Sequence, residues 1–308
     1  MSDPNADRSK SDPIVECLDV SKRFAVGSGV QVHAVERVSL QIGRSETLAV
    51  VGESGCGKST LASLVVGLER VSDGRVLLDG VDITGLSRAA MRPHRRKVQM
   101  VMQDPFSSLD PRRQVGKAVA EPLRIHKVCR GQELEDRVAE LFRQVHLPVD
   151  AMRKYPHQFS GGQRQRVCIA RALALEPELV VADEAVSALD VSVRAQVINV
   201  MMELQEQLGL SYLFISHDLA VVERMAHRVA VMYLGQVVEI GPRRAVLNDP
   251  GHPYTQRLIE AVPVADPSQR RRRSPDNSEI PSPIWKIGEG PQLVEFDEVS
   301  PGHLVARH

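Results

Sequence analysis

The chain has 308 residues, enough for one large domain or two small ones with a hydrophobic core. Lys plus Arg and Asp plus Glu each number 39, so no overall positive field draws the chain to nucleic acid. No apolar run approaches the roughly 18 residues that span a bilayer, and the polar segment 1–13 lacks the apolar core of a secretory signal. We therefore expect a cytoplasmic globular protein, unless a partner holds it to a membrane.

The N-terminal part predicts an antiparallel β unit. Residues 1–12 are polar, and we expect them to be disordered. Segments 14–20 and 39–42 then read as two strands that lead into the next one. Phe24 lies between these two segments. Its ring is a candidate platform for stacking on adenine, although an isolated phenylalanine is more often a core residue.

A glycine-rich loop carries a strong nucleotide signal. Residues 52–60 fit the pattern G-x-x-x-x-G-K-S/T, after an apolar strand-like run at 48–51 and before a helix start at 61–66. Glycines let the backbone curl until several N–H groups face one point, and the helix N-terminus adds partial positive charge. A polyphosphate fits such a nest. The loop by itself indicates a nucleotide, not a particular activity.

Specific roles follow for the residues of this loop. We expect Lys58 to reach the β- and γ-phosphates as a catalytic point charge and the Ser59 hydroxyl to ligate magnesium. Cys56 binds through its backbone N–H, and Thr60 caps or packs. The predicted nucleotide contacts from this loop are Gly52, Glu53, Ser54, Gly55, Cys56, Gly57, Lys58, Ser59 and Thr60.

A glutamine follows the second of two further predicted strands, 74–80 and 97–102. Gln103 stands at the carboxyl edge of that strand, where ligands bind in α/β sheets, and its side-chain oxygen would complete a magnesium shell. Taken alone, a loop glutamine is usually only a surface residue. Its neighbourhood in the fold decides between these interpretations.

A helical region follows, and we interpret it as a subdomain of about 104–170 inserted into the α/β core. From about 111 to 159 charges are frequent, and apolar residues at 134, 138, 141, 142 and 145 share one helix face. It closes on a second glycine-rich turn, Ser160-Gly161-Gly162-Gln163, which opens another helix. This second anion-binding site either covers the same nucleotide or reaches one held by another copy in a two-fold dimer.

Two later strands deliver polar residues to the same edge. The run 179–184 ends in Asp183 and Glu184, which we expect to hold magnesium through water and to orient or deprotonate the attacking water, respectively. Acids at a strand end can also be simple caps. The strand 211–215 leads to His217, a candidate contact of the γ-phosphate, although an isolated histidine is more often an ordinary surface residue.

The C-terminal part is predicted to close the core and then extend beyond it. Strands near 228–232 and 236–240 precede a helix that begins within 251–259. We expect the ATPase domain to cover 13–264, followed by a linker and small extension at 265–308. Within that extension, the segments 284–287 and 293–296 suggest a small β appendage.

These motifs occur in the order and approximate spacing of ABC-transporter ATP-binding subunits, which the chain resembles over about 14–265. The SGGQ turn is the most specific element of that resemblance. Phe159 stands where leucine is usual, and Ala185 where proline often follows the acidic pair. Neither change removes a catalytic group.

The resemblance implies a role for each motif. The SGGQ residues contact ATP held by an opposite subunit, and Asp190 bridges the dimer interface. Gln103 links the site to a membrane-spanning partner, and Phe24 takes the adenine-stacking place. The fold implied is an α/β phosphate-loop ATPase core with an antiparallel β unit, an inserted helical subdomain and a small C-terminal appendage.

The tail resembles the oligopeptide, dipeptide and nickel importer group, through residues 251–263 and the later Pro-Gly-His at 301–303. The function implied is ATP binding and hydrolysis, with ATP and Mg²⁺, that energises a membrane importer of peptides or a related small solute. The implied partners are membrane-spanning permease subunits, a second ATPase subunit, identical or different, and indirectly a solute-binding protein. The implied location is peripheral, on the cytoplasmic face of the cell membrane. The alternative is a soluble ABC ATPase in DNA repair or translation, a class that usually carries coiled-coil or zinc inserts or two cassettes.

Overall fold

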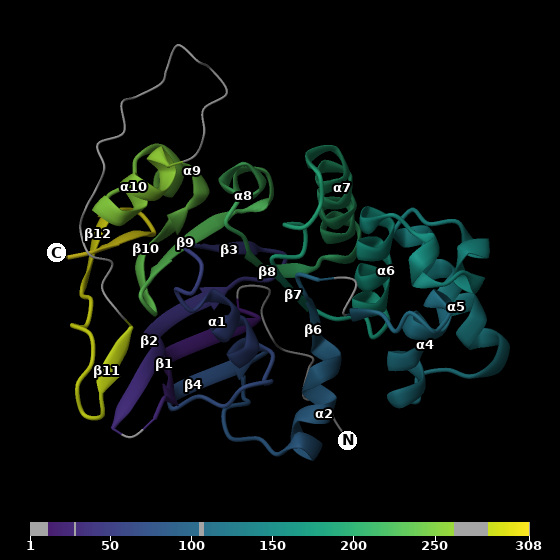
Figure 1. Ribbon diagram of the computed structural model, residues 1–308, viewed down its shortest axis with the longest axis horizontal. Coiled ribbons are helices and arrows are strands. Elements are labelled where there is room, and N and C mark those ends of the chain that lie inside the picture. Colours follow the sequence, from purple (N-terminus) through teal and green to yellow (C-terminus); the bar gives the residue numbers. More distant parts are fainter. Residues whose placement is uncertain (1–11, 28, 105–107, 262–282, 308) are drawn as a thin grey trace, which may run out of the picture.

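The computed structural model describes residues 12–27, 29–104, 108–261 and 283–307. All but the last residue of the segment 1–12, which is predicted to be disordered, and nearly all of the predicted linker therefore lie outside the described residues. Figure 1 shows two sheets at the left and centre and a helical subdomain at the right. Within these ranges, no helix combines the length and apolar character needed to cross a membrane.

The N-terminal half contributes most of an antiparallel sheet, with strand order β11-β2-β1-β4-β5. Its strands are β1 Val15–Ala25, β2 Val30–Ile42, β4 Asp73–Leu78, β5 Val81–Asp82 and β11 Ile284–Lys286. The predicted antiparallel unit is confirmed, but Phe24 belongs to β1, opposite Val32, and does not lie between strands. Irregular register between Cys17 and Arg23 breaks the alternation of buried and exposed residues. The predicted strand 14–20 therefore stops short of Ala25, where β1 ends.

The core sheet has the order β12-β13-β10-β9-β3-β8-β7-β6. Its strands are β3 Thr47–Val51, β6 Val98–Val101, β7 Leu179–Asp183, β8 Ser211–Ile215, β9 Arg228–Tyr233, β10 Gln236–Pro242, β12 Phe296–Ser300 and β13 His303–Ala306. Strands β6 to β9 and β3 run parallel, whereas β10, β13 and β12 continue the sheet in antiparallel pairs. Every residue of β3 is buried, as expected for a central parallel strand covered on both faces.

Helices pack on both faces of the core sheet. They are α1 Lys58–Val65, α2 Arg88–Lys97, α4 Val115–Ile125, α5 Gly131–Gln144, α6 Gly161–Leu173, α7 Val191–Leu208, α8 Leu219–Met225, α9 Arg243–Asn248 and α10 Pro253–Glu260, with 3-10 turns at Val149–Arg153 and Pro156–Gln158. Helix α1 packs against strands of both sheets and shares a hydrophobic core with them. The predicted α/β fold class is confirmed.

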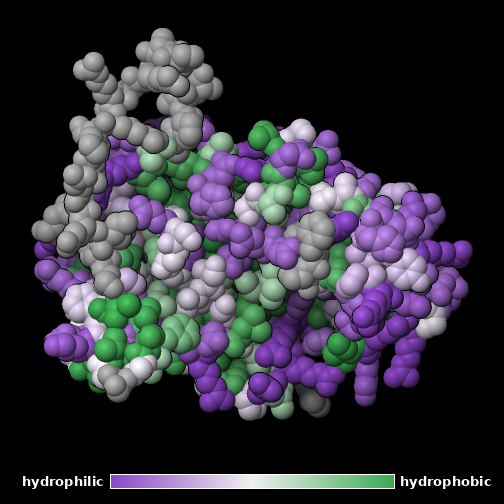
Figure 2. Space-filling view, in the orientation of Figure 1, coloured by the Kyte–Doolittle hydropathy of each residue, from purple (hydrophilic) through white to green (hydrophobic). Residues whose placement is uncertain are grey.

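The helical subdomain consists of α4, α5, α6 and the two 3-10 turns. The predicted apolar stripe of α5 is buried in it, with Leu141, Phe142 and Val145 fully covered. The part of its surface visible in Figure 2 is mostly hydrophilic. Its packing is therefore internal, as the helical spacing predicted.

The C-terminal extension pairs with both sheets. Strand β11 lies beside β2, and β13 lies beside β10. The predicted strand 284–287 is present as Ile284–Lys286, but the predicted strand 293–296 is not, because β12 begins only at Phe296. Sequence patterns show strand character and not partner edges, so this integration was not predicted.

Candidate nucleotide site

The phosphate loop is held in a shape that requires glycine at two positions. Gly52 has φ 151° and Gly57 has φ 107°, in the region that favours glycine. A Cβ on Gly52 would lie 2.2 Å from the Met232 carbonyl oxygen, and one on Gly57 would lie 2.0 Å from the Ala34 carbonyl oxygen. The loop therefore packs its backbone directly onto β2 and β9 and turns into α1 at Gly57.

Lys58 is the first residue of α1, and its side chain is only 4% exposed. Its Nζ donates hydrogen bonds to the carbonyl oxygens of Gly52, at 2.9 Å, and of Glu53, at 2.7 Å. The ammonium thus lies inside the curl of the loop, 3.7 Å from the Cys56 Sγ. Burial raises the pKa of Cys56 although the Lys58 charge opposes this shift, so the thiol is protonated at neutral pH.

Ser59 and Asp183 join the loop to strand β7. The Ser59 hydroxyl donates a 3.0 Å hydrogen bond to Asp183 Oδ1. Burial raises the pKa of the Asp183 carboxyl above its ordinary value; the Ser59 hydrogen bond and the Lys58 charge lower it, and the Glu184 charge adds to the rise. Two hard oxygen donors therefore stand together where α1 begins and β7 ends.

Glu184 and His217 lie at the carboxyl ends of neighbouring strands. The run 179–184 predicted that both acids lie on one strand. Strand β7 instead ends at Asp183, and Glu184 follows it with a left-handed φ of 47°. The Glu184 N–H donates to the Ile215 carbonyl at 3.0 Å, which holds the turn against β8. His217 Nδ1 lies 3.4 Å from Glu184 Oε1.

A cavity of about 280 Å³ opens beside this loop. The predicted residues that line it are Ser54, Gly55, Gly57, Lys58, Ser59, Thr60, Gln103 and Glu184. The remaining lining residues were not predicted from the sequence; they are Val32, His33, Ala34, Gly235 and Pro283. Phe24 is not one of the lining residues, but it pairs in the sheet with Val32, which is. Its side chain is 38% exposed, and Lys22 Nζ lies 4.7 Å from its ring centroid.

The SGGQ turn caps α6 and does not line the cavity beside the phosphate loop. Ser160 Oγ accepts from the Gln163 N–H at 3.3 Å, and Gln163 Oε1 accepts from the Ser160 N–H at 3.0 Å. A Cβ on Gly162 would lie 2.1 Å from Val193 Cγ1, so this glycine permits close packing of α6 on α7. None of the four residues is among those that line the described cavity beside the loop. Within one chain, the two glycine-rich turns are separate.

One contact of the phosphate loop was missed. The Glu53 N–H donates a 3.0 Å hydrogen bond to the hydroxyl of Tyr254, on α10. The available signal was the His-Pro-Tyr segment in the importer-like tail, which had no assigned role.

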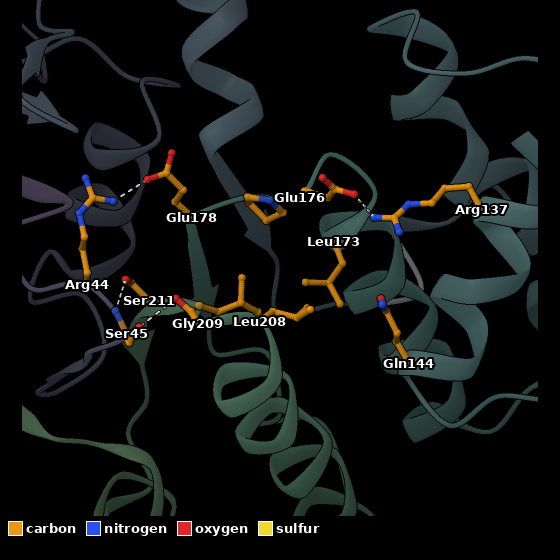
Figure 3. A pocket seen from close by; sticks show the side chains of 12 residues that line it. Arg44, Ser45, Arg137, Gln144, Leu173, Glu176, Glu178, Leu208, Gly209 and Ser211 are labelled. Atoms are coloured by element: carbon orange, nitrogen blue, oxygen red, sulfur yellow. Dashed lines mark hydrogen bonds and ion pairs between the residues drawn. The ribbon is translucent and has the colours of Figure 1, made fainter. Parts of the chain in front are cut away.

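A second cavity, of about 610 Å³, lies at the opposite ends of the parallel strands, near the starts of β7 and β8 (Figure 3). Its arginines are paired: Arg44 lies 2.6 Å from Glu178, and Arg137 lies 2.6 Å from Glu176. The predicted site residues are not among its lining residues. Its charges are balanced, and nothing in it resembles the phosphate-loop site.

Two family models match the chain. Residues 35–187 match the model described as ABC transporter, and residues 238–286 match the C-terminal region of oligopeptide/dipeptide transporters. The chain belongs to the ABC transporter family. The second match covers α10, which carries Tyr254, and β11 together with Pro283, the residue that directly precedes it. Tyr254 contacts the phosphate loop, and Pro283 lines the cavity beside it.

Curated relatives of this cassette include the glutathione import ATP-binding protein GsiA of Pectobacterium atrosepticum, 54% identical over 97% of this chain and 49% of that protein. GsiA of Salmonella typhi is 52% identical with the same coverage. The chain spans about half the length of the curated relatives it matches.

Solved structures of similar fold include a dimeric post-hydrolysis state of the ATP-binding cassette MJ0796 bound to ADP and Pi. It is 29% identical, has a TM-score of 0.68 and covers 75% of this chain and 99% of its own. Another is cbiO1 from Clostridium perfringens, part of the transporter complex cbiONQ, 28% identical with a TM-score of 0.69, covering 77% of this chain and 92% of its own. Both neighbours are cassettes of the same fold.

Proposed function

We propose that the chain is the ATP-binding and ATP-hydrolysing subunit of a membrane ABC importer for peptides or a related small solute. The carrying observation is the meeting of Lys58, the Ser59–Asp183 pair and the Glu184–His217 pair at one edge of the parallel sheet. This set contains a phosphate-binding cation, oxygen donors for a metal, and a carboxylate for water activation. The matches to ABC cassettes support the same conclusion.

The residues present fit a magnesium ion that arrives with the nucleotide. Ser59 and Asp183 present oxygen donors 3.0 Å apart, and Gln103 lines the same cavity. The described residues contain no group of three or more His, Cys, Asp or Glu side chains that could hold a metal. The oxygen donors of Ser59, Asp183 and Gln103 suit Mg²⁺, which usually takes only one or two protein ligands and completes its shell with phosphates and waters. When bound, the ion neutralises charge on the β- and γ-phosphates.

Hydrolysis is assigned to Glu184 and His217. The Glu184 carboxylate orients a water and accepts its proton as the water oxygen attacks the γ-phosphorus. The bond from the γ-phosphorus to the bridging oxygen breaks, which leaves ADP and inorganic phosphate. His217 hydrogen-bonds a γ-phosphate oxygen, while Lys58 and the loop N–H groups hold the charge that develops.

A second subunit completes the site. The SGGQ turn of Ser160 to Gln163 lies outside its own cavity, so its helix N-terminus binds the ATP held by the opposite subunit. Asp190 caps the exposed start of α7, and we assign it to that interface by the resemblance to the family. Phe24 stacks on the adenine at the border of the cavity.

Closure around ATP drives membrane-spanning permease subunits, and a solute-binding protein delivers the solute to them. The cassette then works as a peripheral subunit on the cytoplasmic face of the membrane. The names of the relatives make glutathione a solute to test, and the C-terminal match favours transport over DNA repair or translation. Nucleic acid is not expected as a partner, because the chain carries no net charge.

The experiment is reconstitution of the chain with the permease subunits that co-purify with it, in liposomes supplied with the solute-binding protein. We expect ATP-dependent uptake of glutathione or a short peptide, and no uptake with Glu184→Gln. ATP hydrolysis that no co-purified membrane protein alters, with no uptake, would contradict the transport role.

A further inference from the structure

We propose that Tyr254 is a positioning residue that sets the orientation of the phosphate loop. Its hydroxyl accepts the Glu53 N–H at 3.0 Å. The carbonyl of the same peptide unit, that of Gly52, accepts from Lys58 Nζ at 2.9 Å. One peptide plane is thus fixed by Tyr254 at its N–H and by the ammonium at its oxygen. The inference rests on the proposed function of this loop as the ATP site.

Tyr254 is well suited to hold this plane. Its side chain is 3% exposed, and its ring lies 4.2 Å, centroid to centroid, from that of Tyr233 at the end of β9. Burial raises the pKa of Tyr254, so it remains a neutral phenol at physiological pH. A rigid, uncharged hydroxyl therefore meets the loop from the side of α10.

The start of α10 is anchored by the fully buried carboxylate of Glu239. Glu239 Oε1 accepts from the Gly251 N–H at 2.9 Å, and Oε2 accepts from the His252 N–H at 3.0 Å. The His252 Nδ1 in turn accepts the Tyr254 N–H at 3.1 Å. Each bond in this series fixes the next, so the position of Tyr254 depends on Glu239.

The C-terminal extension joins the same anchor. His303 Nε2, on β13, lies 2.7 Å from Glu239 Oε1, and both side chains are buried. A continuous set of hydrogen bonds therefore runs from the C-terminal strand, through β10 and α10, to the phosphate loop. The C-terminal region thus has a specific role in nucleotide binding, besides covering the edge of the sheet.

Loss of the Tyr254 hydroxyl should mainly weaken the binding of the nucleotide. Without the hydroxyl, the Gly52–Glu53 peptide loses one of its two partners, and the Lys58 ammonium loses a fixed acceptor. We expect Tyr254→Phe to weaken ATP binding about fivefold, the effect of one neutral hydrogen bond. The turnover number should change less than KM, because Glu184 and His217 keep their places.

Tyr212→Phe is the matched control, because it also removes a buried hydroxyl. Its hydroxyl donates to the Met201 carbonyl at 3.1 Å, between β8 and α7, and not to the phosphate loop. Both variants should lower the melting temperature measured without nucleotide. Only Tyr254→Phe should raise the Kd for ATP and the KM.

A second variant, Glu239→Gln, tests the anchor without touching Tyr254. Its amide replaces one accepting oxygen by a donor, so it should also raise KM while the turnover number is retained. Unchanged ATP affinity in both Tyr254→Phe and Glu239→Gln, or an equal loss in Tyr212→Phe, would overturn the inference. A wild-type chain that binds no ATP would instead refute the proposed function.

Discussion

His217 Nδ1 lies 3.4 Å from Glu184 Oε1, and this contact joins the ends of the adjacent parallel strands β8 and β7. The strands are fixed by a paired register in which Asp183 faces Ile215. The backbone of Glu184 is tied to the same Ile215. The sheet therefore fixes the backbone positions of Glu184, assigned to the attacking water, and of His217, assigned to the γ-phosphate.

Glu184→Gln is predicted to abolish turnover while ATP binding persists. The amide keeps the shape of the side chain but cannot accept the proton of the attacking water. We expect kcat to fall at least about 100-fold, within the range for loss of a general base, with ATP affinity within about twofold of wild type. Gel filtration with ATP should show a trapped dimer. Near-normal hydrolysis would remove Glu184 from the role of general base.

His217→Ala is predicted to lower turnover about tenfold or more, through loss of a contact to the γ-phosphate. ADP lacks that phosphate, so the affinity for ADP should not change. His146→Ala is a matched control: His146 is 54% exposed against 58% for His217, and it lies 3.2 Å from Glu203. If both variants lost the same activity, the effect would not be specific to the site.

The parts that sequence reasoning found share one property, which is that their signal is local. The buried runs at β3, β7 and β8 are almost continuously apolar, and the glycine loop has its whole pattern in one run of adjacent residues. Helix α2 was missed because it is polar and buries only Met91, so it has no apolar stripe.

The contacts that sequence reasoning missed depend on partners far along the chain. Tyr254 and Glu53 are 201 positions apart, and their hydrogen bond uses a backbone N–H that no residue type reveals. The pairing of β11 with β2 likewise brings Pro283 to the nucleotide cavity from the other end of the chain. Composition and periodicity identify elements, whereas such pairings arise only from the assembled fold.

Asp183→Asn is predicted to stabilise the nucleotide-free protein at neutral pH. Because burial raises the pKa of Asp183 in the folded chain, its protonated carboxyl stabilises the fold below the ordinary aspartate pKa. This contribution to stability is lost as the pH rises through the raised pKa. Asparagine has no charge to bury and can still accept from Ser59. Thermal unfolding should therefore show the variant above wild type at neutral pH, with the difference narrowing in acid. Magnesium-dependent ATP binding should be lost at the same time.

Asp82→Asn provides the opposite case. Hydrogen bonds from the side chain and backbone of Thr84 lower the pKa of Asp82, so this carboxylate stabilises the fold above its ordinary pKa. That stability is lost as pH falls through the lowered pKa. The variant should unfold below wild type at neutral pH and approach it in acid. If both variants changed the melting temperature at neutral pH in the same direction, burial of the Asp183 carboxylate would not explain the stability of Asp183→Asn.

Ser160→Arg and Lys58→Ala should each disable the homodimer, and their mixture should recover activity. Arginine at position 160 removes the Ser160 cap of α6 and fills the space where a phosphate is expected, whereas loss of Lys58 removes the charge within the loop. A mixed dimer then contains one site with both halves intact. Equal amounts that pair at random should give about a quarter of wild-type activity, since half the dimers are mixed and each has one working site.

The control for this mixture is Lys58→Ala combined with the double variant Lys58→Ala/Ser160→Arg. No loop in that mixture retains Lys58, so no intact site can form and no activity should return. The trapped Glu184→Gln dimer establishes beforehand that this chain pairs with itself. If it does, and the mixture of single variants stays inactive, the SGGQ turn does not act across subunits. Recovery would show that the loop of one chain and the Ser160 turn of another form a single site. ATP would then contact both chains, and closure of the dimer would depend on bound ATP.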